Sequence, residues 1–510
     1  MLRFLIRRVL SGLAIMLVAS FLYYVMVAAV IDPLEDLRTR PGVDTPMLIE
    51  QRIELLRLDD SVISRYISWL GAFVTGDLGS SWNTGRAVGD MLSGAVISTI
   101  QLLTMSTIIA ILLGVAVGIV SALRQYTSFD YLITFVSFLL FSLPSFWVAV
   151  LLKQWGAIGY NDFLRDPTLA IPVIIGIGAL AGVIWMLAIG GDLRRRITVF
   201  VAATAATSGV FLYLQLSNWW LRPHINIVLQ LVLGVATALA VTAVSTGLRN
   251  RRALGASMST VAVGLIIYAY LNFGGGWSFL TPVMNWGLLL VFAVVAAAVG
   301  AAVGLAWGGP DKGQSARTAA ILAVFLAVYV TIDRLLQAWP TYFGALSGRP
   351  IATTGDRTPN LGGNFWIGAL DTYSHLVLPT LVLLLISFAG YTRYSRATML
   401  ETMNQDYIRT ARAKGLNERT VIMRHAFRNT LIPLATIVPV DIITMLGGAL
   451  ITERIFNRPG MGAMFLTNLD MNDIEPVMAY LIIVAALAIV ANMVADLIYA
   501  VLDPRIRVDA

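Results

Sequence analysis

Apolar runs of about twenty residues recur along this chain and limit its possible folds more than any other sequence feature. A helix of that length crosses the hydrocarbon layer of a bilayer, which is about 30 Å thick. The chain is 58% hydrophobic and only 13% charged, a balance typical of multi-span membrane proteins. We therefore predict an all-α polytopic membrane protein of about twelve spans. The runs cover residues 9–31, 96–122, 131–155, 168–190, 197–216, 225–247, 257–273, 283–307, 318–336, 375–389, 431–451 and 478–502.

The first run follows Arg3, Arg7 and Arg8. A signal peptide also begins with basic residues, but its apolar core is only about 7–15 residues long. We expect an uncleaved first span that starts in the cytoplasm. Loops rich in arginine or lysine tend to stay on the cytoplasmic side, and an even number of spans returns the C-terminus to that side. Such loops occur at residues 192–196, 249–252 and 312–317.

A polar segment at residues 391–433 separates two of the later apolar runs. Residues 398–413 lack Gly and Pro and are rich in helix formers. Gly415 offers a helix stop and Asn417 a fresh cap, so a second short helix is expected to about Arg428. Charge alone would suit an ordinary basic cytoplasmic loop. The basic residues are Arg393, Arg396, Arg409, Arg412, Lys414, Arg419, Arg424 and Arg428, and the acidic ones are Glu401, Asp406 and Glu418.

The order of residues in this segment, QDYIRTARAKGL and then RHAFRNTLIP, resembles the coupling loop of permease subunits in ABC importers of the dipeptide/oligopeptide/nickel family. The broader importer motif is Glu-Ala-Ala, three residues, then Gly. Arg409, Thr410 and Ala411 stand at its first three positions and Gly415 at its last; the Glu is absent, so no role for it carries over. The resemblance implies contact with an ATPase subunit through Asp406, Tyr407, Arg409, Thr410, Ala411, Arg412, Ala413, Lys414, Gly415 and Leu416. Small residues among these (Ala411, Ala413, Gly415) would let a partner approach closely.

Other stretches resemble the same family. MLRFLIRRVL is similar to its opening, SLPSFW to its third span, and residues 503–507 to its ending. Residues 56–82 resemble the external segment of one of its two permease types, although Arg57 and Ser61 stand where Gly and Pro are usual. The partner type usually lacks this segment, so the resemblance implies a heterodimer. ITERIFNRPGMGAMF also matches and implies an external gate at Glu453, Pro459, Gly460 and Gly462.

The family resemblance does not cover residues 157–370, which hold about six extra apolar runs. The resemblance thus implies a type I ABC importer permease core of six spans with six inserted ones. The expected parts are a first span (1–31), an external segment (32–95), core spans two and three (96–156), the insert (157–370), and core spans four to six (371–510) with the coupling loop at 393–430. We expect the insert to form a peripheral bundle against lipid; the alternative is a docking platform that uses Trp219, Trp220 and Trp277.

Three polar residues within the last two runs are candidates for a substrate path: Asp441, Thr444 and Asn492. An ionisable group in mid-span costs about 2.5–3.5 kcal/mol on insertion scales, so such residues are often functional. Asp441 and Asn492 equally suit helix–helix hydrogen bonds that fix packing. In the insert, Asp333 and Arg334 lie near a span end and are expected to snorkel to the surface.

Several classes of protein are excluded or disfavoured. There is no Cys, and the three His lie in separate segments, so a metal site is not expected. The P-loop GxxxxGK[ST] is absent, and GGPDKGQS has the wrong spacing. This argues against an exporter with its own ATPase, and places ATP and Mg in partner subunits; this chain itself is expected to bind no cofactor and to have no enzymatic activity. A secondary transporter remains an alternative, although no repeated halves are visible.

The family implies four kinds of partner: a second homologous permease, two ATPase subunits or one fused, an external substrate-binding protein, and membrane lipid. Nucleic acid is not expected, because the net charge of +7 lies mostly in short loops. The expected location is the cytoplasmic (inner) cell membrane, with multiple spans and both termini in the cytoplasm. We predict that the chain imports di- or oligopeptides; nickel chelates and glycosides are alternative cargoes within the family.

Overall fold

The computed structural model describes residues 2–39, 45–309 and 312–502, and in these ranges the chain is almost wholly helical. The first half contains α1 (Leu2–Val30), α2 (Glu35–Thr39), α3 (Thr45–Leu56), α4 (Val62–Val74), α5 (Val88–Leu123), α6 (Ser128–Ser142), α7 (Ser145–Leu151), the π-helical η1 (Leu152–Gly159), α8 (Tyr160–Phe163), α9 (Ile171–Ile189), α10 (Leu193–Leu216) and α11 (Ile227–Ser245). The second half contains α12 (Arg251–Phe273), α13 (Gly276–Leu280), the 3₁₀ turn η2 (Thr281–Val283), α14 (Trp286–Ala306), α15 (Lys312–Ala345), α16 (Phe365–Met403), α17 (Asp406–Ala413), α18 (Glu418–Thr420), the π-helical η3 (Val421–Ala426), α19 (Phe427–Ile455), α20 (Met461–Asp470) and α21 (Ile474–Leu502).

The number of spans agrees with the prediction from apolar runs. Eleven helices among the described residues are long and apolar enough to cross a membrane, and a bent pair, residues 128–142 with 145–163, makes a twelfth. The pair turns by 100° at Pro144, which precedes α7 and cannot continue the ladder of α6. The prediction of an all-α polytopic protein is confirmed.

The helix that follows the polar segment is longer than we expected. The second short helix was predicted to stop near Arg428, but α19 runs to Ile455 through Pro433 and Pro439. The Thr436 hydroxyl donates to the Pro433 carbonyl at 2.8 Å. Side-chain hydrogen bonds of this kind are one reason that membrane helices tolerate proline.

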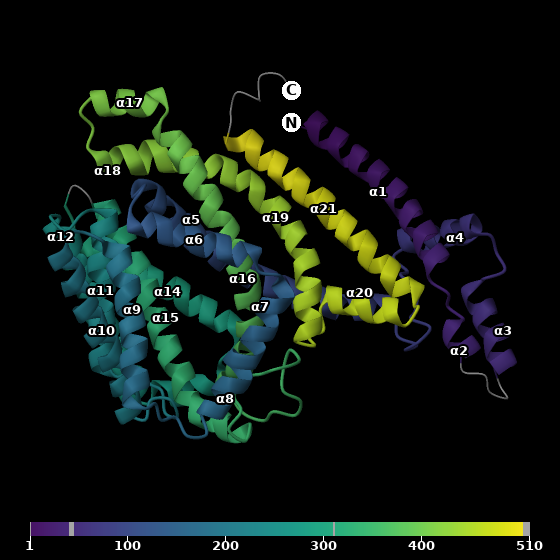
Figure 1. Cartoon of the computed structure of the whole chain (residues 1–510), viewed down its shortest axis with the longest axis horizontal. Helices are drawn as coiled ribbons and strands as arrows, with labels where there is room; N and C mark the ends of the chain where they lie inside the picture. Colours follow the sequence, from purple (N-terminus) through teal and green to yellow (C-terminus); the bar gives the residue numbers. More distant parts are fainter. Residues whose placement is uncertain (1, 40–44, 310–311, 503–510) are drawn as a thin grey trace.

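One face of the molecule, here called the terminal face, carries the start of α1, the end of α21 and the whole of α17 (Figure 1). The opposite face is called the distal face. Between them α5, α16 and α19 form the centre, with α21 and α1 beside them. The pair Gly114 and Gly118 lets α5 lie directly on α16, because a Cβ at Gly114 would come within 2.7 Å of the Tyr391 Cβ.

The inserted spans form two groups rather than the single bundle that we expected. The hairpin α9–α10 packs against α6, and α11, α12, α14 and α15 form a four-helix group that packs on α16 through α15. Gly178 and Gly182 of α9 lie against Ser208 and Thr204 of α10, which brings the hairpin helices close. Both groups lie on the side of α16 away from α1 and α21 (Figure 1).

Candidate functional site

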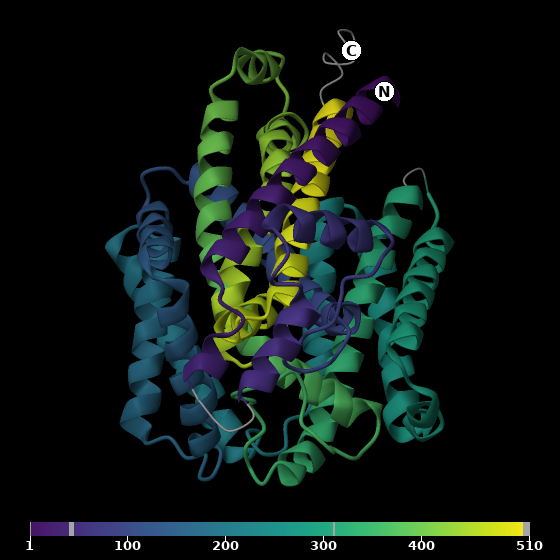
Figure 2. The same ribbon diagram turned by 90° about the vertical axis from the view of Figure 1, so that its right-hand side faces the viewer.

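The predicted coupling loop, residues 393–430, forms a helical bracket on the terminal face, above the ends of the inserted helices (Figure 2). We expected one continuous helix over residues 398–413, but α16 ends at Met403 and the separate helix α17 begins at Asp406. Gly415 has φ +72, the left-handed conformation typical of a helix stop. Asn417 accepts a hydrogen bond from the Thr420 N–H at 2.8 Å. The predicted helix stop at Gly415 and the predicted N-cap at Asn417 are therefore both present.

One side of α17 anchors the bracket. Ile408 and Ala411 are buried against Met399 and Val421. Ala411 therefore packs within its own chain. Our prediction that it contacts a partner closely is wrong. The other nine predicted coupling residues are all exposed: Asp406, Tyr407, Arg409, Thr410, Arg412, Ala413, Lys414, Gly415 and Leu416. The result is a firmly seated helix with a polar outer surface.

An ion pair closes the bracket from within. Arg412 Nη2 lies 2.7 Å from Glu418 Oε1, and Arg412 Nε donates to Glu418 Oε2 at 3.2 Å. This joins the end of α17 to α18 across the Gly415 turn. Because both side chains are about half exposed, the pair contributes little to stability in itself. The main effect of the ion pair is to hold the turn at Gly415 in one geometry.

We expect Arg412→Glu to weaken the turn by placing two carboxylates together, whereas the exchange Arg412→Glu with Glu418→Arg restores the pair. If the pair positions α17, the exchange should recover most of the uptake that the single variant loses. Uptake of radiolabelled dipeptide by cells provides the measurement. If the exchange is as defective as the single variant, Arg412 itself contacts a partner, and the positioning role is wrong.

A second, stronger ion pair fastens the bracket to the neighbouring span. Arg396 donates to Asp130 of α6 through Nε at 2.6 Å and Nη2 at 2.8 Å. The same carboxylate accepts the Ser121 hydroxyl at 2.5 Å and the Tyr126 N–H at 3.1 Å. Only 3% of the Asp130 side chain is exposed. In the sequence Arg396 is one of eight basic residues in the polar segment, and its partner lies 266 residues away.

The insert also contacts the bracket. Arg419 donates to the carbonyls of Ala243 and Val244, at 2.9 Å for Ala243. These carbonyls belong to the last turn of α11, where a cation is favoured by the helix dipole. The four-helix group thus reaches the coupling bracket as well as α16.

On the distal face, the predicted gate residues meet around a buried carboxylate. Glu453 Oε1 accepts the Thr99 hydroxyl of α5 at 2.6 Å, and Oε2 accepts the N–H groups of Gly462 at 2.8 Å and Ala463 at 3.1 Å. Those N–H groups start α20, where negative charge is favoured. Gly460 and Gly462 leave room for the turn, since a Cβ on either would overlap Glu453 or Leu450. The arrangement closes the α19–α20 turn onto α5.

A hollow lies beside this turn. Two cavities, of about 820 Å³ and about 750 Å³, share Gln101, Asp356, Arg357 and Arg458 in their walls. Pro459, the remaining predicted gate residue, lines the second. We call these two cavities together the distal vestibule.

Arg458 is the vestibule residue that the sequence analysis missed. It is only 2% exposed, and its Nη2 donates to the Gln101 Oε1 at 3.4 Å. Its Nε and Nη1 have no hydrogen-bond partner among the described residues. Burial lowers the pKa of the Arg458 guanidinium. The nearby Asp356 and Glu453 carboxylates offset this effect in part. A buried cation with unused donors is nevertheless costly, so the site is suited to receive an anion. Its place in the family-like stretch RIFNRPG, directly before Pro459, was the feature of the sequence that could have identified it.

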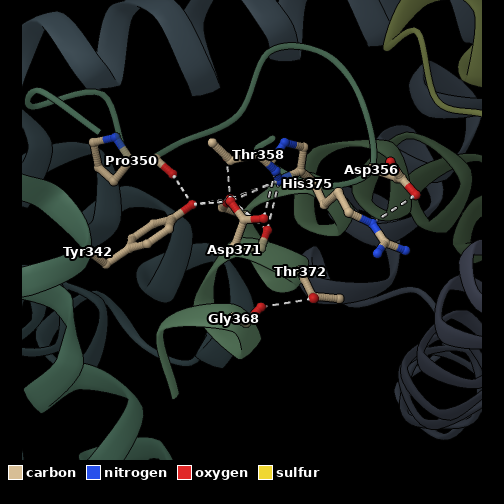
Figure 3. Close-up of polar contacts among 10 residues, drawn as sticks. Tyr342, Pro350, Asp356, Thr358, Gly368, Asp371, Thr372 and His375 are labelled. Atoms are coloured by element: carbon tan, nitrogen blue, oxygen red, sulfur yellow. Dashed lines mark hydrogen bonds and ion pairs between the residues drawn. The ribbon is translucent and has the colours of Figure 1, made fainter. Parts of the chain in front are cut away.

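The wall of the vestibule is fixed by a polar cluster at the start of α16 (Figure 3). Asp371 accepts the Thr358 N–H at 2.8 Å and the Thr358 hydroxyl at 2.6 Å, and Tyr342 of α15 donates to it at 3.2 Å. His375 Nδ1 lies 2.8 Å from the Asp371 carbonyl. These contacts tie the connection 346–364 to α15 and α16, so the cluster is structural.

The three path candidates are not joined in one constellation by the described contacts. Asp441 is half-buried and lies near Tyr391 of α16, whose hydroxyl has no hydrogen-bond partner among the described residues. Asn492 is exposed and donates to the Ala488 carbonyl of its own helix at 3.0 Å. Thr444 lies in α19, but its side chain is outside the described residues.

Asp333 in the inserted block does not snorkel to the surface as we expected. It is 1% exposed and accepts the Ile225 N–H at 2.7 Å.

A bundle of about twelve spans, a polar bracket on one face and a vestibule on the other define a multi-span membrane transport component. Among the described residues, no group of three or more His, Asp or Glu side chains is placed to hold a metal ion.

Comparison with known proteins agrees with this class. Residues 114–508 match the family described as binding-protein-dependent transport system inner membrane component, and residues 1–92 match its N-terminal family. The chain belongs to this family and is a permease subunit, which confirms the resemblance drawn from the coupling loop.

Similar curated proteins carry peptide-transport names. The oligopeptide transport system permease protein AppB of Bacillus subtilis is 45% identical over 137 residues, which are 27% of this chain and 43% of AppB. The dipeptide transport system permease protein DppB of Escherichia coli is 42% identical over 145 residues, 28% of this chain and 42% of DppB. The oligopeptide transport system permease protein OppB of Mycobacterium tuberculosis is 24% identical over 508 residues, covering 100% of both chains.

Proposed function

We propose that this permease carries peptides into the cell as part of an ATP-driven importer in the cytoplasmic membrane. The names of AppB, DppB and OppB support peptides as the cargo class. The observation that carries the proposal is α17, whose inner side is buried while nine predicted coupling residues are exposed on the terminal face. On this proposal the terminal face is cytoplasmic and receives the ATPase subunits, which bind ATP and Mg. A second permease completes the path, and an external binding protein delivers the peptide.

Both arms of the bracket continue into spans, which gives a route for coupling. α16 leads from the bracket to the polar cluster around Asp371, and η3 leads through α19 to Glu453. Closure of ATPase subunits that hold α17 would therefore move both walls of the distal vestibule. Such domain closure is a common way in which ligand binding shifts a two-state equilibrium.

The vestibule has the charges that a peptide requires. Arg458 and the exposed Arg357 would attract a carboxylate, and Asp356, which lines the same cavities and lies 3.7 Å from the Arg357 Nε, would attract an amino group. Charge-assisted hydrogen bonds of this kind are stronger than neutral ones. A zwitterionic peptide fits this arrangement better than an uncharged glycoside does.

Two substitutions at Gly415 test the coupling proposal. A Cβ there meets no atom of this chain within 4 Å, but φ is +72. Leu would be strained in that conformation, whereas Asn adopts it more readily. If a partner packs on the turn, both Gly415→Leu and Gly415→Asn should abolish ATP hydrolysis stimulated by the binding protein in proteoliposomes.

The two variants separate strain from crowding. Recovery of stimulated hydrolysis in Gly415→Asn would show that only backbone strain matters, and near-normal activity of both variants would refute the docking assignment. Uptake that persists without ATP would instead favour a secondary transporter.

A further inference from the structure

The four-helix inserted group contains an apolar cavity that the transport proposal does not use. Its volume is about 230 Å³, and its lining residues come from α12, α13, α14 and α15. Apolar side chains dominate the lining, including Val263, Ile267, Phe292, Val295, Ala296 and Leu326. Apolar cavities of about 150 Å³ already stay dry and bind small hydrocarbons.

The cavity opens sideways between α12 and α14. Ile267 and Val295 line it and are also 45% and 52% exposed, so its rim reaches the surface of the spans. The two helices are joined towards the terminal face, where the Trp307 indole donates to the Ser259 hydroxyl at 3.0 Å. Towards the distal face, Trp277 of α13 forms the end wall. The opening therefore faces the hydrocarbon of the bilayer.

An arginine stands at the distal end of this cavity. The Arg334 guanidinium lies 5.6 Å from the centre of the Trp277 ring. It donates to Gln337 at 3.0 Å and to Thr281 at 3.4 Å, while its Nε has no hydrogen-bond partner among the described residues.

The nearest acid in sequence does not neutralise Arg334 by direct contact. The two oxygens of Asp333 accept hydrogen bonds from the Ile225 N–H and the Gln337 amide, each at 2.7 Å. No ion pair of Arg334 occurs among the described residues. A smaller polar pocket of about 160 Å³, lined by Arg334, Gln337 and Asn364, adjoins the guanidinium.

We propose that this site binds an anionic membrane lipid, with one acyl chain in the apolar cavity and the headgroup phosphate on Arg334. The apolar lining suits a hydrocarbon chain, and a guanidinium that makes no ion pair suits a phosphate oxygen. The site is separate from the distal vestibule, because the two have no lining residue in common, although Trp286 of α14 lines the vestibule. It does not depend on which substrate the permease carries.

Native mass spectrometry of the detergent-purified transporter tests the proposal. The probes are phosphatidylglycerol and phosphatidylcholine with identical oleoyl chains. Ala296→Phe fills the cavity and should abolish retention of both lipids. Ala298→Phe is the matched control: it lies on the same helix, is exposed, and does not line the cavity. It should bind as the wild type does.

Arg334→Gln should keep the acyl-chain site but lose the preference for phosphatidylglycerol, by about tenfold if one charge-assisted pair is removed. This second variant keeps the test valid if Ala296→Phe does not fold. Equal retention of the two lipids by the wild type, unchanged binding in Ala296→Phe, or binding of free oleate in place of phospholipid would each overturn the proposal.

Discussion

Gly462→Ala should abolish peptide uptake and destabilise the protein. A Cβ at this position would overlap the Cα of Leu450, and that atom belongs to the backbone of α19 and cannot rotate away. The shift needed would also pull the Gly462 N–H from the Glu453 carboxylate, 2.8 Å away. Leaving a buried acceptor without one of its hydrogen-bond donors costs about 1–3 kcal/mol. Thermal unfolding of the purified chain and dipeptide uptake by cells measure the two effects.

Gly94→Ala provides the matched control for this prediction. Gly94 lines the same vestibule, but a Cβ there meets no atom within 4 Å. It lies in the interior of α5, where Ala is favoured over Gly by about 0.5–1 kcal/mol. The control should therefore be at least as stable as the wild type and transport normally. Wild-type stability and uptake in Gly462→Ala would show that the turn does not close on Glu453 in the working protein.

Asp130→Asn should uncouple the transporter. It removes the charge that Arg396 contacts at 2.6 Å and 2.8 Å. Breaking a buried pair costs about 3–5 kcal/mol, and we expect the lower end because 27% of the Arg396 side chain is exposed and can be hydrated. With the bracket loosened from α6, the ATPase subunits should hydrolyse ATP without matching uptake. The ratio of ATP hydrolysed to dipeptide imported is the measurement.

A double-mutant cycle with Arg396→Met separates this pair from general damage. If the two residues act through each other, the double variant should be little worse than either single variant. Arg428→Met removes an exposed cation from the same bracket and should leave the ratio unchanged. Additive losses in the cycle would mean that Asp130 and Arg396 have separate roles.

The spans were predictable because a bilayer requires about twenty apolar residues in a row, and this requirement is local in sequence. Gly415 and Asn417 were predictable for the same reason, since helix stops and caps depend on neighbouring residues. The insert was counted correctly as six runs. Its division into two groups was not predicted, because it depends on which helix faces meet.

The functional contacts that the sequence did not reveal are those between distant residues. Asp130 and Arg396 look like ordinary loop charges until α6 and α16 are placed together. Arg458 gains its significance only from burial beside Gln101 of α5. Ala411 was assigned to the outer surface of α17 although it packs inward, because the family motif does not tell which side of a short helix is buried.

Both inserted groups lie on one side of α16, and this gives the protein a lopsided outline in the plane of the bilayer (Figure 1). In the proposed assembly, a second permease would have to approach along the perimeter that these helices leave free. If that partner has no inserted spans, the outline of the pair, viewed along the membrane normal, would lack two-fold pseudosymmetry. Neighbouring membrane proteins would then meet a broad helical flange on one flank and the bare transport core on the other.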